Sequence, residues 1–235
     1  MANRCTHIPE IMLPREGTDL SKWAVIACDQ YTSQPEYWAE TDRIVGGAPS
    51  TLRLTLPEVY LEDADVAGRT AQIHETMRRY IADGTLRTLP AGVVLTERWS
   101  GGTCPRRGVV LAVDLAAYEY TPGSASLIRP TEKTVVERIP PRLKVRQGAC
   151  MELPHIMILI DDPDRGIIEP LFEKTASLEK LYDTDLMQNG GHITGWFIPK
   201  GAETDAIEAG LEALCDRDTF NRKYGCTDAQ ALLPY

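Results

Sequence analysis

Residues 92–99 read Gly-Val-Val-Leu-Thr-Glu-Arg-Trp, and residues 108–115 read Gly-Val-Val-Leu-Ala-Val-Asp-Leu. Both stretches are rich in the β-branched and apolar side chains that strands prefer. Residues 100–105, Ser-Gly-Gly-Thr-Cys-Pro, separate them with small and turn-forming residues. The sequence therefore predicts two strands joined as a hairpin with a loose tip.

Helix and strand patterns alternate irregularly on both sides of this hairpin. The clearest helix covers residues 66–81, where most apolar side chains share one face and Asp83-Gly84 follows as a stop signal. Further helices are expected at residues 36–45, 177–182 and 203–216, and further strands at residues 23–28, 155–160, 167–172 and 192–198. This mixture predicts an α/β chain of the mixed α+β type. We expect residues 1–235 to form one unit, a mixed, partly antiparallel sheet with flanking helices.

The composition is that of a globular protein that is acidic overall. The chain has 235 residues and a formal net charge of −9, and 43% of its residues are hydrophobic. An acidic protein repels the phosphate backbone, so nucleic acid is an unlikely partner unless a basic patch exists. Apolar runs such as 156–160 are far too short to cross a membrane.

Cysteine usage points to a reducing compartment. The six cysteines form no Cys-x-x-Cys pair, and the first residues lack the apolar stretch of a signal peptide. We therefore expect a cytoplasmic protein with reduced thiols and no membrane partner.

The strongest candidate for a binding site is the basic segment 129–146. Six basic and two acidic residues give these 18 residues a net charge of +4 in a chain of −9. Its arginines are Arg129, Arg138, Arg142 and Arg146. The planar guanidinium fork suits phosphate or carboxylate groups, although a charge run of this kind is also typical of a solvated basic strand.

Two details favour an anion site in this segment. Pro140-Pro141 lie between Arg138 and Arg142 and restrict where both can point. Glu132 lies among the cations, where its pKa should fall, and could accept a proton from a hydroxyl group close to an anion.

Residues 28–33, Cys-Asp-Gln-Tyr-Thr-Ser, precede the helix expected at 36–45. The start of a helix with hydroxyl side chains is a natural cradle for an anion, which makes Asp29, Thr32 and Ser33 candidates. Plain N-capping by Thr32 or Ser33 is the alternative.

Two further motifs have simpler alternatives. Asp161 and Asp162 end the expected strand at 155–160, where paired carboxylates can hold magnesium; turn formation before Pro163 is the alternative and is favoured. His192 follows two glycines that would let it approach a ligand, or that merely form a turn.

Several stretches together resemble one family, the bacterial domain of unknown function 1015. They are residues 27–38 (Ala-Cys-Asp-Gln-Tyr-Thr-Ser-Gln-Pro-Glu-Tyr-Trp), 126–132 (Ser-Leu-Ile-Arg-Pro-Thr-Glu), 137–142 (Glu-Arg-Ile-Pro-Pro-Arg), 153–156 (Leu-Pro-His-Ile) and 189–192 (Asn-Gly-Gly-His). The similarity spans nearly the whole chain in the right order. The family looks related to the ParB/sulfiredoxin-like group, which includes kinases of free serine.

This resemblance implies ATP or ADP, magnesium, and phosphoryl transfer to free serine or a similar small hydroxyl compound. It implies phosphate contacts from Arg129, Arg138 and Arg142, and a base or orienting role for Glu132. It also implies help from Asp29 or Asp161 with the metal or the substrate ammonium group.

Family members usually continue into a glycine-rich and histidine-containing signature that would begin near Tyr235. We therefore expect this chain to be the N-terminal part of a longer family domain, with weak or no activity alone. A non-catalytic nucleotide- or anion-binding regulatory module is the alternative function, and a nucleic-acid-binding protein is a third that the acidic charge disfavours. The acceptor, the nucleotide preference and the oligomeric state stay open.

Overall fold

The computed structural model describes residues 4–119, 121, 124, 126–129, 135–153 and 155–225. Its strands are β1 (Cys5–Thr6), β2 (Ile11–Pro14), β3 (Leu86–Leu89), β4 (Gly92–Trp99), β5 (Arg106–Val110), β6 (Ala112–Val113), β7 (Glu179–Leu186) and β8 (Gly191–Pro199). Its α-helices are α1 (Leu20–Trp23), α2 (Pro35–Val45), α3 (Val66–Ala82), α4 (Ile139–Arg146), α5 (Glu169–Phe172), α6 (Ala202–Leu214) and α7 (Arg217–Tyr224). Short 3-10 helices lie at Thr51–Arg53, Glu58–Tyr60, Leu115–Ala117, Val136–Arg138 and Thr175–Ser177.

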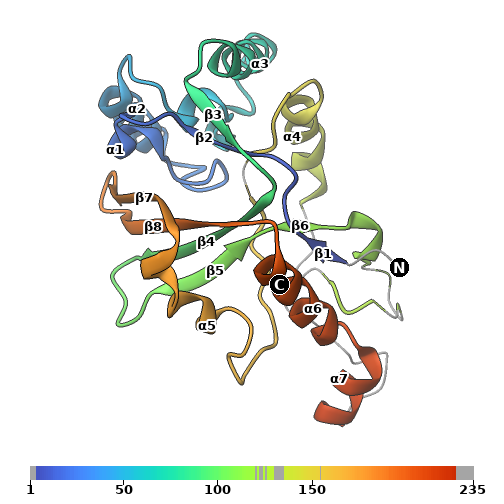
Figure 1. Cartoon of the computed structure of the whole chain (residues 1–235). Helices are drawn as coiled ribbons and strands as arrows, with labels where there is room; N and C mark the ends of the chain where they lie inside the picture. The colour runs from blue at the N-terminus through green and yellow to red at the C-terminus, as the bar shows by residue number, and fades with distance from the viewer. Residues whose placement is uncertain are drawn as a thin grey trace.

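A four-stranded antiparallel sheet with the order β5-β4-β8-β7 forms the centre of the fold. Two smaller antiparallel pairs, β2 with β3 and β1 with β6, complete the described sheets. Figure 1 shows the four-stranded sheet in the middle, with α1, α2 and α3 on one side and α5 and α6 on the other. The fold is therefore of the mixed α+β class, as the sequence predicts.

Strand β4 is the core of this sheet because both of its faces are buried. Val93 and Leu95 point to one side and pack with Leu171 of α5 and Leu211 of α6. Val94 points to the other side, where it packs against the β2–β3 pair. Burial on both faces explains the continuous apolar run at the start of this strand.

A separate apolar cluster joins α1, α3 and the residues that follow α4. Trp23, Ile73, Met77 and Tyr80 form its centre. Helix α4 is tied to α3 by His74, whose Nε2 lies 2.7 Å from the Val145 carbonyl oxygen. This cluster fixes α4 beside α3, and α4 carries two of the arginines that the sequence analysis selects.

The strands and helices with strong local signals are confirmed. The hairpin is β4 and β5, paired antiparallel across residues 100–105, and the helices expected at 36–45, 66–81 and 203–216 are α2, α3 and α6. The strand expected at 192–198 is β8. The run 108–115 is only partly a strand, because it divides between β5 and β6, and Leu115 then begins a 3-10 helix.

Three expected strands and one expected helix were wrong. Residues 23–28 form no strand: Trp23 is the last residue of helix α1, which Asp19 caps at its start by accepting the Ser21 N–H at 3.2 Å. Residues 167–172 contain α5, which begins with a proline in its first turn. Residues 177–182 were expected to be helical, but most of them belong to β7, where pairing with β8 overrides local preference.

The apolar run 155–160 is not a strand either. Ile156 is 80% exposed, and Met157, Ile158 and Leu159 are also exposed. Only Ile160 packs against the core beneath the sheet. An apolar run becomes a strand only where a neighbouring strand accepts it, and within the described residues β5 pairs with β4 alone.

The cysteines that the structure describes, Cys5, Cys28, Cys104, Cys150 and Cys215, are all free thiols. Among the described helices, none combines the length and the apolar character that crossing a bilayer requires.

Leu95→Ala tests the central position of β4. Leu95 is fully buried, so truncation should lower the free energy of unfolding by about 2–5 kcal/mol. The matched control is Leu115→Ala, because Leu115 is 80% exposed and its truncation should change stability by about 0.5 kcal/mol or less. Urea denaturation measures both, and equal losses would contradict the described core.

Candidate functional site

Two of the predicted arginines meet at one buried carboxylate. Arg138 precedes α4 and Arg142 lies one turn inside it, so both side chains fall on the same face of the helix. Arg138 Nη1 donates to Glu58 Oε2 at 2.8 Å, and Arg142 Nε donates to Glu58 Oε1 at 2.5 Å. Arg142 Nη2 also pairs with Oε1. We call these three residues the Glu58 site.

The Glu58 site has a buried side and an exposed side. The Glu58 side chain is only 3% exposed, whereas those of Arg138 and Arg142 are 44% and 40% exposed. A buried carboxylate is costly unless it is paired and hydrogen bonded. Glu58 therefore depends on both arginines, and the arginines form the outer surface of the site.

The segment 28–29 lies next to this site, which unites two of the signals found in the sequence. The Glu58 N–H donates to the Cys28 carbonyl oxygen at 2.8 Å. Burial raises the pKa of the Cys28 thiol, the Asp29 and Glu58 carboxylates raise it further, and Arg142 opposes them. A thiol with a raised pKa is a poor nucleophile at neutral pH. Asp29 is exposed, and its carboxylate accepts only a 3.3 Å hydrogen bond from Gln30 among the described residues.

Thr32 and Ser33 do not cap α2. The capping position is Gln34, and it makes no side-chain hydrogen bond to the helix. The loop before α2 is held instead by Trp38, whose indole N–H donates to the Gln30 carbonyl oxygen at 3.3 Å. The N-capping alternative is therefore wrong, while an anion at this helix start stays a prediction.

Arg129 is not part of the Glu58 site. It is 9% exposed, and its Nε donates to the Ser126 carbonyl oxygen at 2.7 Å while Nη2 donates to the Ser124 carbonyl oxygen. Arg129 therefore does not share the Glu58 contact of Arg138 and Arg142, because its guanidinium satisfies the carbonyl groups of its own loop. Arg146 forms an exposed ion pair with Glu152. Glu132 lies outside the described residues.

The two candidate metal ligands are engaged in other interactions. Tyr224 donates its hydroxyl proton to Asp161 Oδ1 at 2.7 Å. Asp162 Oδ2 accepts the Ile167 N–H at 2.9 Å, which is the turn role that the alternative predicts. No group of three or more histidine, cysteine or acidic side chains is placed to hold a metal ion within the part of the chain that the structure describes.

His192 hydrogen bonds to two carboxylates on β7. It is the second residue of β8, after the turn that follows β7, and it lies across from Asp185 on β7. Its Nδ1 is 2.8 Å from Asp185 Oδ1, and its Nε2 is 2.7 Å from Asp183 Oδ1. These carboxylates raise the pKa of His192, because a neutral imidazole has one N–H and cannot donate to both.

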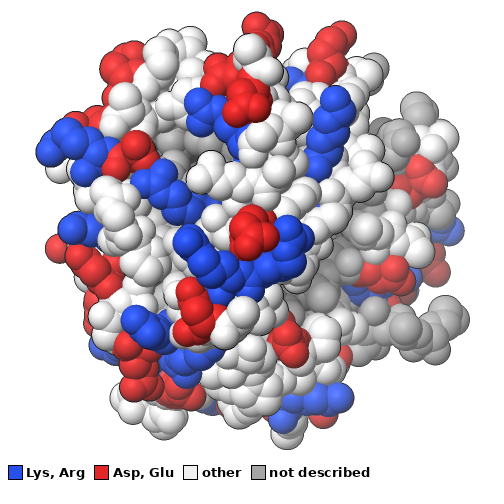
Figure 2. Space-filling view, turned by 90° about the horizontal axis from the view of Figure 1, so that it is seen from above, with Lys and Arg blue, Asp and Glu red and all other residues white. Residues whose placement is uncertain are grey.

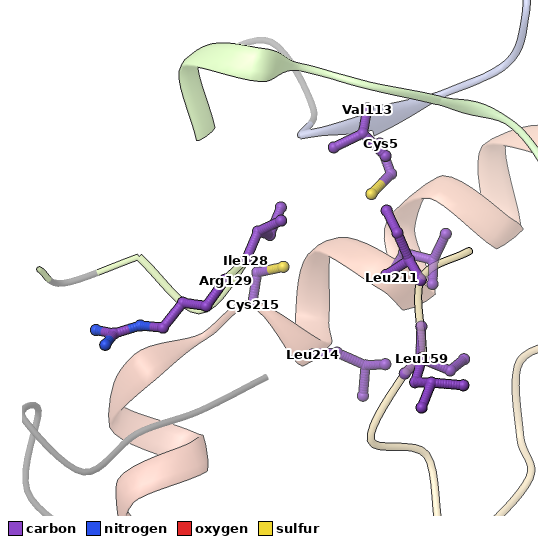
Figure 3. Close-up of a pocket in the computed structure, with 10 residues that line it drawn as sticks. Cys5, Val113, Ile128, Arg129, Leu159, Leu211, Leu214 and Cys215 are labelled. Atoms are coloured by element: carbon purple, nitrogen blue, oxygen red, sulfur yellow. The ribbon is translucent and has the colours of Figure 1, made fainter. Parts of the chain in front are cut away.

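An apolar pocket that no motif in the sequence indicates lies between β1, β6 and the end of α6 (Figure 3). The side chains of Cys5 and Cys215 line it, and the guanidinium of Arg129 points out of it. Burial raises the pKa of Cys5 to about 11. An apolar pocket with protonated thiols offers little to a phosphate group.

The surface charge is mixed around the upper face of the molecule. Figure 2 shows lysine and arginine side chains interspersed with aspartate and glutamate side chains on this face. A nucleic-acid backbone is typically bound by a basic patch or stripe. This face therefore favours a small anion over a polyanion.

Glu58 is the functional candidate that sequence reasoning missed. Its only signal is an acid within the otherwise uncharged stretch 54–61, Leu-Thr-Leu-Pro-Glu-Val-Tyr-Leu. A single acid in such a stretch does not reveal which cations it meets, because its partners lie 80 and 84 residues away.

Comparison with known proteins gives one match. A family model described as "Protein of unknown function (DUF1015)" matches residues 12–217. No curated protein and no solved structure matches the chain significantly.

The His192 geometry predicts a histidine that titrates above its ordinary pKa of about 6.5. Both hydrogen bonds need the imidazolium form, so their contribution to stability is present below about pH 6.5 and is lost as the pH rises through the folded-state pKa. Imidazole chemical shifts in an NMR pH titration measure this pKa. Asp185→Asn and Asp183→Asn should each lower it, whereas Asp218→Asn on the distant α7 should not. A pKa at or below 6.5 in the unsubstituted chain would contradict the described geometry.

Proposed function

The chain belongs to the DUF1015 family, and from this premise we propose that it binds nucleotide phosphates at the Glu58 site. We further propose that it transfers a phosphoryl group from ATP or ADP to free serine or a similar small hydroxyl compound. The observation that carries the proposal is the meeting of Arg138 and Arg142 at a surface where both arginine side chains stay at least 40% exposed.

The chemistry of phosphoryl transfer matches what these arginines can supply. Transfer requires positioning and neutralisation of charge more than covalent chemistry from the protein. Glu58 engages Nη1 of Arg138 and Nε and Nη2 of Arg142. Each guanidinium carries five N–H donors, so donors remain on both side chains for a phosphate that approaches from solvent.

The catalytic roles in this proposal come from the family resemblance. Glu132 would act as the base or orient the acceptor hydroxyl, and the exposed carboxylate of Asp29 would bind the ammonium group of serine. Magnesium would enter bound to the nucleotide. Asp161 and Asp162 are engaged by Tyr224 and the Ile167 N–H, so they do not fit a magnesium site and have no part in the proposal.

A non-catalytic nucleotide- or anion-binding module is the second candidate. One observation favours it: within the described residues, the carboxylate nearest the two guanidinium groups is Glu58, which is buried and bonded to both. Such a carboxylate is a poor base for an acceptor hydroxyl. Binding without turnover needs only the arginines.

Arg142→Ala tests the binding step common to both candidates. Loss of charge-assisted hydrogen bonds to a phosphate should weaken nucleotide binding by about 1.5–3 kcal/mol, measured by isothermal titration calorimetry with ADP and with ATP. Arg222→Ala is the matched control, because Arg222 lies on α7, away from α4 (Figure 1). Equal affinities in the two variants would show that the nucleotide binds elsewhere.

Turnover separates the two candidates. The chain is incubated with ATP or ADP, magnesium and serine, and phosphoserine is followed by mass spectrometry. Product that disappears in Arg142→Ala supports the transferase, and Glu132→Gln should then lower turnover by about 10²–10⁴-fold. Nucleotide binding without phosphoserine, both from this chain and from a form extended past Tyr235, would remove the transferase and leave the binding module.

A further inference from the structure

We propose that Glu58 is a positioning residue for the anion site: it holds Arg138 and Arg142 from below so that their remaining N–H groups face a phosphate on the solvent side. This inference rests on the proposed function. It adds a role for a residue that would not itself touch the ligand.

The difference in burial places Glu58 beneath the arginines. Its side chain is 3% exposed, while the two guanidinium-bearing side chains keep 44% and 40% of their surface exposed. A ligand from solvent therefore reaches the arginines before it could reach the carboxylate. Glu58 is poorly placed to swing in and out as a competing anion.

The backbone around Glu58 is fixed at several points. The Glu58 N–H donates to the Cys28 carbonyl oxygen at 2.8 Å, and the Glu58 carbonyl oxygen accepts the Leu61 N–H at 3.0 Å. Pro57 precedes it and restricts the chain on the other side. The backbone that carries the Glu58 carboxylate is therefore held in place, and this carboxylate orients the side chains of Arg138 and Arg142.

Alignment matters because free arginine side chains are flexible. An arginine loses substantial rotamer entropy when it is ordered by a ligand. Two oxygens of one carboxylate already order both guanidinium groups, with Oε2 bound to Arg138 and Oε1 bound to Arg142. The ligand then meets donors that are arranged in advance, and the two arginines and one glutamate retain a formal charge of +1 for it.

A role for Glu58 as a competitor of phosphate predicts the opposite change in anion affinity. If Glu58 only competed with phosphate, its removal would free two cations and tighten anion binding by Coulomb attraction. If it positions the arginines, its removal should loosen binding even though the site becomes more positive. The sign of the change therefore decides between the two roles.

The experiment measures ADP binding by calorimetry at fixed ionic strength for Glu58→Ala and Glu58→Gln. We expect the dissociation constant of Glu58→Ala to rise about tenfold or more, as expected for a lost charge-assisted contact, with a smaller rise for Glu58→Gln. Glu152→Ala is the charge-matched control, because Glu152 pairs with Arg146 of helix α4 and its side chain is 68% exposed. It should leave affinity unchanged or slightly improved.

A double variant separates positioning from damage to the fold. In an Arg142→Ala background only one guanidinium is left to position, so Glu58→Ala should cause a smaller further loss of ADP binding than it causes in the unsubstituted chain. A further loss of the same size would mean that Glu58 acts only through general stability and would overturn the positioning role. Unchanged or tighter ADP binding in Glu58→Ala alone would also overturn it. Absence of ADP binding in the unsubstituted chain would overturn the proposed anion site itself, together with this inference.

Discussion

The candidate site depends on one interaction, the hydrogen-bonded ion pairs that Arg138 and Arg142 form with the buried Glu58 carboxylate. It connects a 3-10 helix, the loop at Cys28 and helix α4, which are far apart in sequence. The physical constraint is simple: a carboxylate that is 3% exposed must have cationic or hydrogen-bonding partners. Meeting this constraint brings two guanidinium groups to one place on the surface.

The rest of the fold holds the elements that carry these ion pairs in place. Helix α4 is held against α3, and α3 belongs to the cluster of Trp23, Met77 and Tyr80. The four-stranded sheet provides a separate core on both faces of β4. The arginines therefore lie at the start of a helix that is tied to α3 through His74 and Val145, which suits a binding site better than a free loop does.

Local chemistry explains which elements the sequence could predict. The β4–β5 hairpin, α3 and α6 carry strong periodic or turn signals, and the structure contains them. The strand predicted at residues 155–160 is absent because an apolar pattern does not specify a partner strand, and β5 does not pair with these residues. Pairing between distant strands, as in β4 with β8, is equally invisible in a local pattern.

The site was predictable only in part, for the same reason. The charge run and the two prolines identify Arg138 and Arg142 as a pair, but they equally suggested Arg129, which satisfies its own loop carbonyl groups. Nothing near Glu58 in the sequence indicates its partners. The most direct test of the account is a crystal structure of the chain with ADP. We predict phosphate oxygens within hydrogen-bonding distance of both Arg138 and Arg142, with Glu58 still bound beneath them. ADP bound elsewhere, or Glu58 displaced from the arginines, would contradict it.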